Sequence, residues 1–295
     1  PLLTWIDLPS NPWRNYTGRL VASSACLRLS VSCLAAAHMC TIETDARESL
    51  NSWHEIYVWL REASLRVLND KIRFVLTRKP SKPESSLVSS SVTETLASVI
   101  LLCYSEAFLP APGRWSLHLH GCRTIVNHLR LLDRMQKPTR PIEAFLIKEV
   151  SDLETLSNIS IFNITTKATT QVPAQSTYST SFWAFTNFIY EVTTLERQRH
   201  SAMPQHSSDV DMSIWRARAE ESYCRTMLNV DTMLGQQKST IQCFEVVVRA
   251  YYYAIVIYSY QALAPQNMTA AADAVSKLLK IVQDMHTVDT GPAQA

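Results

Sequence analysis

Two histidines separated by one residue are the side chains of this sequence best suited to acid/base chemistry. His118 and His120 occur in the segment RWSLHLHGC. On a helix, side chains two residues apart point about 200° away from each other, so these two cannot easily bind one metal ion. We therefore expect one of them to be a buried hydrogen-bond donor. A ligand-binding or acid/base role is the alternative.

The other histidines and the cysteines favour structural roles. His200 and His206 lie in a polar loop segment, where histidines outside a cluster of metal ligands are usually solvated. Cys26, Cys33 and Cys40 recur every seven residues, which places them on one face of an apolar helix as small buried residues. The seven cysteines include no Cys-x-x-Cys pair, so neither a disulfide framework nor a zinc cluster is indicated. We predict no metal and no cofactor.

The common catalytic motifs are missing from the sequence. It contains no Gly-x-Ser-x-Gly elbow, phosphate-binding loop, dinucleotide fingerprint or His-Glu-x-x-His zinc helix. This excludes the common enzyme classes but leaves enzymes with unusual mechanisms open.

The composition indicates an all-α protein. The chain of 295 residues has only 5 glycines, with 46% hydrophobic and 18% charged residues. A formal net charge of +2 gives no strong attraction to nucleic acid or to an anionic membrane, and the basic residues are spread along the chain. We therefore expect neither nucleic acid nor a membrane among its direct partners.

A helical hairpin over Ser91–Leu132 is the most clearly marked element. Ser91 and Glu94 can form a capping box before the apolar run Leu96–Leu109, which two prolines end. The second helix should begin near Arg114.

One glycine interrupts this second helix. Gly121 lowers helix stability by roughly 1 kcal/mol relative to alanine, which suggests that another helix approaches closely there.

Hydrophobic periodicity predicts further helices in the rest of the chain, giving nine to ten in one domain of residues 1–295. They are expected near 13–20, 21–39, 46–76, 142–162, 181–199, 214–234, 243–263 and 269–285. Polar, proline-, serine- or threonine-rich stretches predict loops at about 77–91, 165–180 and 200–213, and a tail at 286–295.

The most apolar predicted helix is Cys243–Leu263. Its length approaches that of a membrane span, but Glu245 and Arg249 form a helical ion pair in the pattern and tyrosines interrupt the aliphatic run. A buried central helix is the favoured interpretation.

Four stretches, in order and spacing, resemble the fungal-specific transcription factor domain, the helical regulatory region of binuclear zinc-cluster regulators. The most specific is RWSLHLHGC, with Trp115, His118, Leu119 and Gly121, after the helix LASVILLCYSEAF. The others are NPWRNYTGRLVASSACLRLSVSCLAAAHM, EIYVWLREASLRVL and RAYYYAIVIYSY. The resemblance covers most of residues 11–285, with Cys122 where alanine is expected.

The six-cysteine cluster and basic linker that read DNA in such regulators do not occur in this chain. The resemblance therefore implies a regulatory domain that binds an apolar small molecule or a protein partner, with a homodimer as a further arrangement, and does not bind DNA by itself. The alternative is a cofactor-independent enzyme of fungal secondary metabolism, such as a Diels-Alderase acting on a terpenoid or polyketide. The first would be nuclear and the second cytoplasmic.

A bound small molecule, whether effector or substrate, would need a pocket. We expect aromatic side chains to line it and a histidine to supply its polar group. The candidate residues are Trp115, His118, His120, Trp183, Tyr251, Tyr252 and Tyr258.

Overall fold

The computed structural model describes most of the chain as helix. The described residues are 11–42, 47–77, 85–109, 114–133, 140–160, 182–201, 210–228 and 238–289. Over these ranges the structure contains ten α-helices and no strand, so the predicted all-α class and helix number are confirmed.

The chain divides into two compact units. The N-terminal unit is Leu8–Leu153, and the C-terminal unit is Glu154–Ala295 together with Pro1–Asp7. The expected single domain stays a prediction, and each unit is described by itself.

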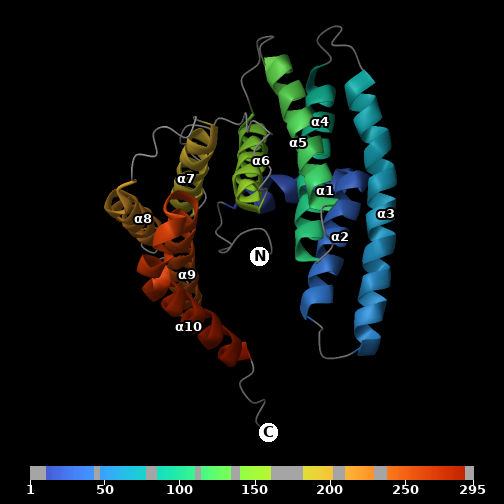
Figure 1. Cartoon of the computed structure of the whole chain (residues 1–295). Coiled ribbons are helices and arrows are strands. Elements are labelled where there is room, and N and C mark those ends of the chain that lie inside the picture. Colours follow the sequence, from blue (N-terminus) through green and yellow to red (C-terminus); the bar gives the residue numbers. More distant parts are fainter. Residues whose placement is uncertain are drawn as a thin grey trace. The chain divides into compact units, whose positions relative to one another are not determined.

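The N-terminal unit contains a π-helical turn and the first five α-helices, followed by most of a sixth (Figure 1). These elements are η1 (Trp13–Thr17), α1 (Gly18–Ser23), α2 (Ala25–Ile42), α3 (Arg47–Thr77), α4 (Ser85–Phe108), α5 (Arg114–Asp133) and α6 (Pro141–Ser160). Helix α6 continues across the boundary into the C-terminal unit.

Helix α4 forms the centre of the N-terminal unit. It packs against α2, α3 and α5. Four of its large apolar side chains are almost completely buried: Leu96, Ile100, Leu101 and Leu102. A helix that is apolar on most sides must be covered on most sides, which explains why α4 lies between its neighbours.

In the N-terminal unit, two helix boundaries differ clearly from the predicted ones. Helix α4 begins at Ser85 and not at Ser91, so the predicted loop 77–91 is wrong over its last part. Serine is only a moderately poor helix former, and Leu87 and Val88 continue the apolar pattern through the serine run. The segment predicted as one helix over 21–39 is divided at Ser24, whose backbone is extended at φ −111° and ψ 113°.

The glycine of α5 lies opposite helix α4. A methyl group added at Gly121 would be 3.7 Å from Cγ1 of Val99, which is an ordinary van der Waals distance. Helix α4 does approach at this position, but not so closely that it excludes alanine.

The C-terminal unit is built around α9. Its elements after the end of α6 are α7 (Trp183–Ser201), α8 (Met212–Met227), α9 (Lys238–Leu263), the 3-10 helix η3 (Pro265–Ala271) and α10 (Ala272–Asp289). Helix α9 packs against α7, α8 and α10. Its buried residues, including Phe244, Val248 and Ile255, join a core with Phe185 and Phe188 of α7.

By length and composition alone, Ile241–Leu263 could span a membrane, and no other helix among the described residues passes that test. The core helix of a soluble protein meets the same criteria. In the C-terminal unit, α9 is not buried around its whole circumference, because Tyr251, Tyr252 and Tyr253 are only partly buried. The predicted buried helix is therefore a helix with one buried face.

The remaining loop predictions are tested only at their edges. Helix α7 ends at Ser201 and α8 begins at Met212, which fits a loop near 200–213, although residues 202–209 lie outside the described ranges. The predicted loop 165–180 lies outside them entirely. Helix α10 continues to Asp289, so the predicted tail starts later than residue 286.

Candidate functional site

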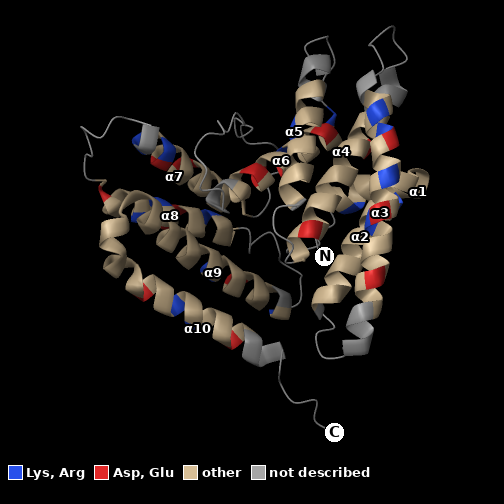
Figure 2. Cartoon of the chain, turned by 45° about the vertical axis from the view of Figure 1, so that its right-hand side comes forward, with Lys and Arg blue, Asp and Glu red and all other residues tan. Residues whose placement is uncertain are grey.

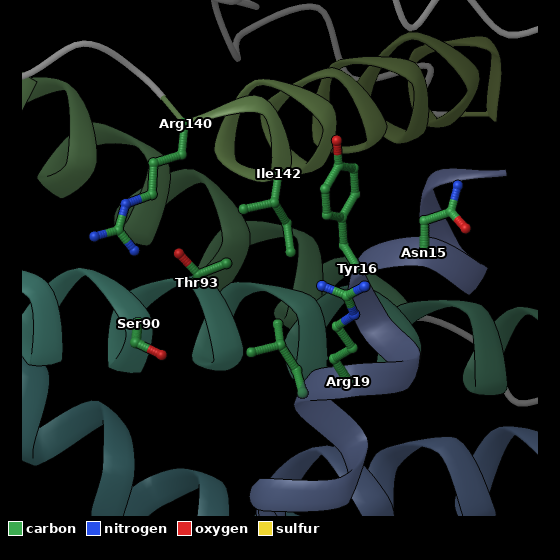
Figure 3. A pocket seen from close by; sticks show the side chains of 8 residues that line it. Asn15, Tyr16, Arg19, Ser90, Thr93, Arg140 and Ile142 are labelled. Atoms are coloured by element: carbon green, nitrogen blue, oxygen red, sulfur yellow. The ribbon is translucent and has the colours of Figure 1, made fainter. Parts of the chain in front are cut away.

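The N-terminal unit has an open pocket of about 390 Å³ where three segments meet (Figure 3). One segment is η1 with α1, the second is the first half of α4, and the third is the start of α6. The lining residues are Asn15, Tyr16, Arg19, Leu20, Ser90, Thr93, Arg140 and Ile142.

The side of the pocket formed by α4 and α6 is held by the carboxylate of Glu143. Its Oε1 accepts a hydrogen bond of 3.4 Å from the Thr93 hydroxyl, and its Oε2 accepts one of 3.1 Å from the backbone N–H of Arg140. The second contact caps the first turn of α6, where Pro141 needs no hydrogen-bond acceptor. The backbone of Arg140 and the hydroxyl of Thr93 are therefore held by the same carboxylate.

Two arginines give the pocket a positive charge. Arg19 and Arg140 are exposed, and neither guanidinium group forms an ion pair with a carboxylate among the described residues. The nearby carboxylate of Glu94 accepts from the Ser90 hydroxyl at 3.1 Å and pairs with Lys71. This acidic group is therefore already neutralised by a lysine of α3.

None of the residues predicted from the sequence lines this pocket. The sequence carries no local signal for it, because its lining residues come from segments about 70 and 50 residues apart that only the fold brings together.

His118 of α5 instead lies in a largely buried cluster with Glu106 of α4 and Arg61 of α3. Its Nε2 lies 3.5 Å from Oε1 of Glu106, and this oxygen lies 2.5 Å from Nε of Arg61. Glu106 is 2% exposed. Burial lowers the pKa of His118, and the nearby Glu106 carboxylate opposes that effect. The neutral imidazole therefore fits the predicted role of a buried hydrogen-bond donor.

His120 points elsewhere, as the helical spacing predicted. It is exposed, while His118 is half-buried. Trp115, one turn earlier on α5, is half-buried, and its carbonyl oxygen lies 3.6 Å from the Cys103 thiol, which donates to it.

The other predicted pocket residues belong to the C-terminal unit, so the predicted set is divided between the two units. The ring of Tyr251 lies 4.9 Å from that of Phe182, and the ring of Tyr252 lies 5.2 Å from that of Tyr223. The hydroxyl of Tyr258 is 2.7 Å from that of Thr193. These are the contacts of packed side chains, and a ligand-binding role for them stays a prediction.

Trp183 lines a second, smaller pocket of about 180 Å³ between α7 and α8. The charged groups there are already matched, because Arg218 pairs with Glu191 and Arg225 pairs with Glu221 at 2.6 Å. This pocket therefore offers a ligand little unsatisfied charge.

The cysteine row is buried, which confirms its predicted packing. Cys26, Cys33 and Cys40 are all buried, and burial raises the pKa of Cys26 and raises that of Cys33 to about 11. The thiols of Cys26 and Cys33 are therefore protonated at neutral pH and poorly suited to nucleophilic or metal chemistry. No group of three or more histidine, cysteine or acidic residues that could hold a metal ion occurs in the described part of the chain.

Comparison with protein-family models identifies the family of this chain. The family model described as the fungal-specific transcription factor domain matches residues 1–292, and no zinc-cluster domain is found in the chain. No curated protein and no solved structure matches. Because the family model covers nearly the whole sequence, the predicted family is confirmed. The chain belongs to the fungal-specific transcription factor family and is a regulatory domain of that intracellular class.

Proposed function

We propose that this chain is an effector-sensing regulatory domain, and that its effector binds in the pocket formed by η1 with α1, α4 and α6. The pocket itself is the observation that carries the proposal. Its volume of about 390 Å³ is within the usual range for small-molecule sites, and it combines apolar side chains with hydroxyl, amide and guanidinium groups.

The position of the pocket supports a regulatory role. A ligand there would contact three chain segments at once and stabilise the arrangement in which they meet. The segment after Arg140 is α6, the continuous helix that passes from the N-terminal unit into the C-terminal unit at Leu153 and Glu154. Binding at the first turn of α6 would therefore act on an element shared by both units.

This proposal replaces the apolar ligand of the sequence prediction by a polar one. A nuclear location and a protein partner that receives the signal follow from the same proposal, since a transcriptional regulator acts where its target genes are. Homodimer formation stays a prediction.

A reporter assay tests the proposed function. The chain would be fused to a heterologous DNA-binding domain, and reporter transcription would be measured against a library of fungal metabolites. We expect at least one compound to change transcription with the wild-type fusion and to have no effect on a Ser90→Trp fusion, whose indole fills the pocket. The matched control is Ser52→Trp, at an exposed position of α3.

The proposed function is wrong if no compound changes transcription, or if Ser90→Trp responds like the wild type. The abundance of each fusion, measured by immunoblot, shows whether a lost response reflects a lost protein. A Ser90→Trp fusion that is as abundant as the wild-type fusion makes the comparison valid.

The alternative cyclase function would require an apolar chamber that holds a folded substrate. The tyrosines expected to line it pack against neighbouring side chains, as in the Tyr251–Phe182 and Tyr258–Thr193 contacts, and their role in a substrate chamber stays a prediction. No observation favours this function over effector sensing. Incubating the purified chain with terpenoid and polyketide precursors tests it directly, and turnover would support it.

A further inference from the structure

We infer that the effector is a small organic anion, a carboxylate or a phosphate ester, whose negative charge is attracted by Arg19 and Arg140. This inference rests on the proposed effector site and specifies the chemistry of its ligand. Carboxylates and phosphate esters both present negatively charged oxygen atoms to an arginine. Binding measurements with one probe of each type distinguish them.

The two arginines reach the pocket from different elements. Figure 3 shows Arg19 extending from α1 and Arg140 extending from the segment before α6, with Ile142 and Thr93 between them. Guanidinium groups bind carboxylates and phosphates through paired N–H donors, so each arginine offers a geometrically specific contact. Hydroxyl groups of Tyr16, Ser90 and Thr93 are further polar groups of the lining.

The local charges favour an anion. The carboxylate of Glu143 lies next to the pocket, but it accepts from the Thr93 hydroxyl and from the Arg140 backbone, and Thr93 covers it from the α4 side. The carboxylate of Glu94 is paired with Lys71. Arg19 and Arg140 carry two positive charges near the one negative charge of Glu143, so the net charge at the pocket is positive. A cationic ligand would be repelled by both guanidinium groups.

The apolar part of the lining indicates an organic body. Leu20 and Ile142 are half-buried and lie among the polar groups, and the ring of Tyr16 stands beside Ile142 in Figure 3. An inorganic anion would leave these surfaces uncovered. A molecule with an acidic group and a short aliphatic or aromatic part would cover them.

Titration calorimetry and thermal unfolding with four probes test the inference. The probes are phenyl phosphate, adipate, inorganic phosphate and the neutral adipamide, all at one ionic strength. The proteins are the full chain, Arg19→Gln, Arg140→Gln and the control Arg66→Gln. Arg66 is an exposed arginine of α3 that pairs with Glu62, so its replacement removes the same charge away from the pocket.

We expect phenyl phosphate or adipate to bind and to raise the unfolding temperature, with inorganic phosphate weaker and adipamide without effect. Binding of phenyl phosphate alone identifies a phosphate ester, and binding of adipate alone identifies a carboxylate. Each pocket substitution should weaken the bound probe by about tenfold or more, and Arg66→Gln by less than about twofold. An unfolding temperature of the free variants equal to that of the wild type shows that they are folded.

Three results would overturn the inference. The first is that Arg66→Gln weakens probe binding as much as the two pocket substitutions do. The second is that adipamide binds as strongly as adipate, and the third is that no anionic organic probe binds. If the reporter fusion still responds to a neutral compound and Ser90→Trp blocks that response, the effector site stands and only the anionic ligand is wrong. If the reporter is also unresponsive, the proposed function fails with it.

Discussion

The carboxyl group of Glu149 is a buried proton-binding group that lies outside the candidate pocket. It is on α6, and its Oε2 accepts a 3.0 Å hydrogen bond from the Tyr104 hydroxyl of α4. Burial raises the pKa of Glu149 from 4.5 to about 7, although the Lys148 ammonium acts in the opposite direction. Lys148 itself pairs with Asp152, whose pKa burial also raises. Glu149 therefore changes its charge near neutral pH.

This raised pKa makes the stability of the N-terminal unit depend on pH. Between pH 4.5 and about 7 the folded chain keeps the Glu149 proton that the unfolded chain has lost, so the free energy of unfolding falls as pH rises. Glu149→Gln keeps an acceptor for Tyr104 and removes this ionisation. We expect it to be more stable than the wild type at pH 8, by up to about 3 kcal/mol, and to lose most of that advantage at pH 4.5.

Urea unfolding at both pH values measures the difference. The control is Glu62→Gln, a change at an exposed glutamate of α3, which should alter stability equally little at both. A Glu149→Gln advantage that is the same at pH 4.5 and pH 8 would show that Glu149 does not ionise in this range.

At the scale of single residues, the sequence predicts which way a side chain points better than it predicts which residues that side chain contacts. The helical period is enough to separate His118 from His120, and the structure bears this out. The same pattern cannot name Glu106 or Arg61 as neighbours of His118, because Arg61 lies on another helix, 45 residues before Glu106. Charged groups find buried partners through tertiary packing, which local spacing does not encode.

At the scale of helices, the contact between α4 and α5 allows a direct test of packing. The methyl group of an alanine at Gly121 would meet Val99 at 3.7 Å, without overlap. Alanine also restricts the unfolded chain more than glycine does. We expect Gly121→Ala to raise the free energy of unfolding by roughly 1 kcal/mol, measured by urea unfolding.

A larger side chain at the same position provides the contrast. Gly121→Leu would extend beyond that methyl position toward Val99 and should destabilise the hairpin by about 1–3 kcal/mol. Loss of stability in Gly121→Ala would mean that α4 and α5 approach more closely than the 3.7 Å distance indicates.

Most helices are predictable from their apolar period, but their ends are not. The start of α5 at Arg114 was predicted correctly, because two prolines and a glycine precede it. The break at Ser24 was not predicted, because the apolar residues before and after Ser23 and Ser24 are compatible with one helix. There the Ser24 hydroxyl accepts from the backbone N–H of Leu27 at 3.4 Å and caps α2. The local sequence does not distinguish a serine inside a helix from a serine that caps one, because both can form hydrogen bonds to the nearby backbone.

At the scale of the whole chain, charge is distributed in pairs. Basic and acidic residues are interspersed along α3 and along α10 (Figure 2). Several basic side chains have acidic partners, including Arg61 with Glu106, Lys71 with Glu94 and Lys277 with Asp273 at 2.8 Å. Paired charges contribute little to the long-range potential that attracts a polyanion.

This charge distribution predicts that the chain binds DNA weakly and without sequence preference. With a net charge of +2 and several of its cations paired, the chain can release few counterions from a duplex. We expect dissociation constants of about 10⁻⁴ M or weaker at roughly 0.15 M salt, equal for two unrelated duplexes of the same length. Fluorescence anisotropy of labelled duplexes measures the two dissociation constants.

The Arg19→Gln variant should have the same dissociation constants, because a small organic anion and not a nucleic acid is the proposed ligand of that arginine. Preference for one duplex by more than about tenfold would instead show that this domain reads sequence itself.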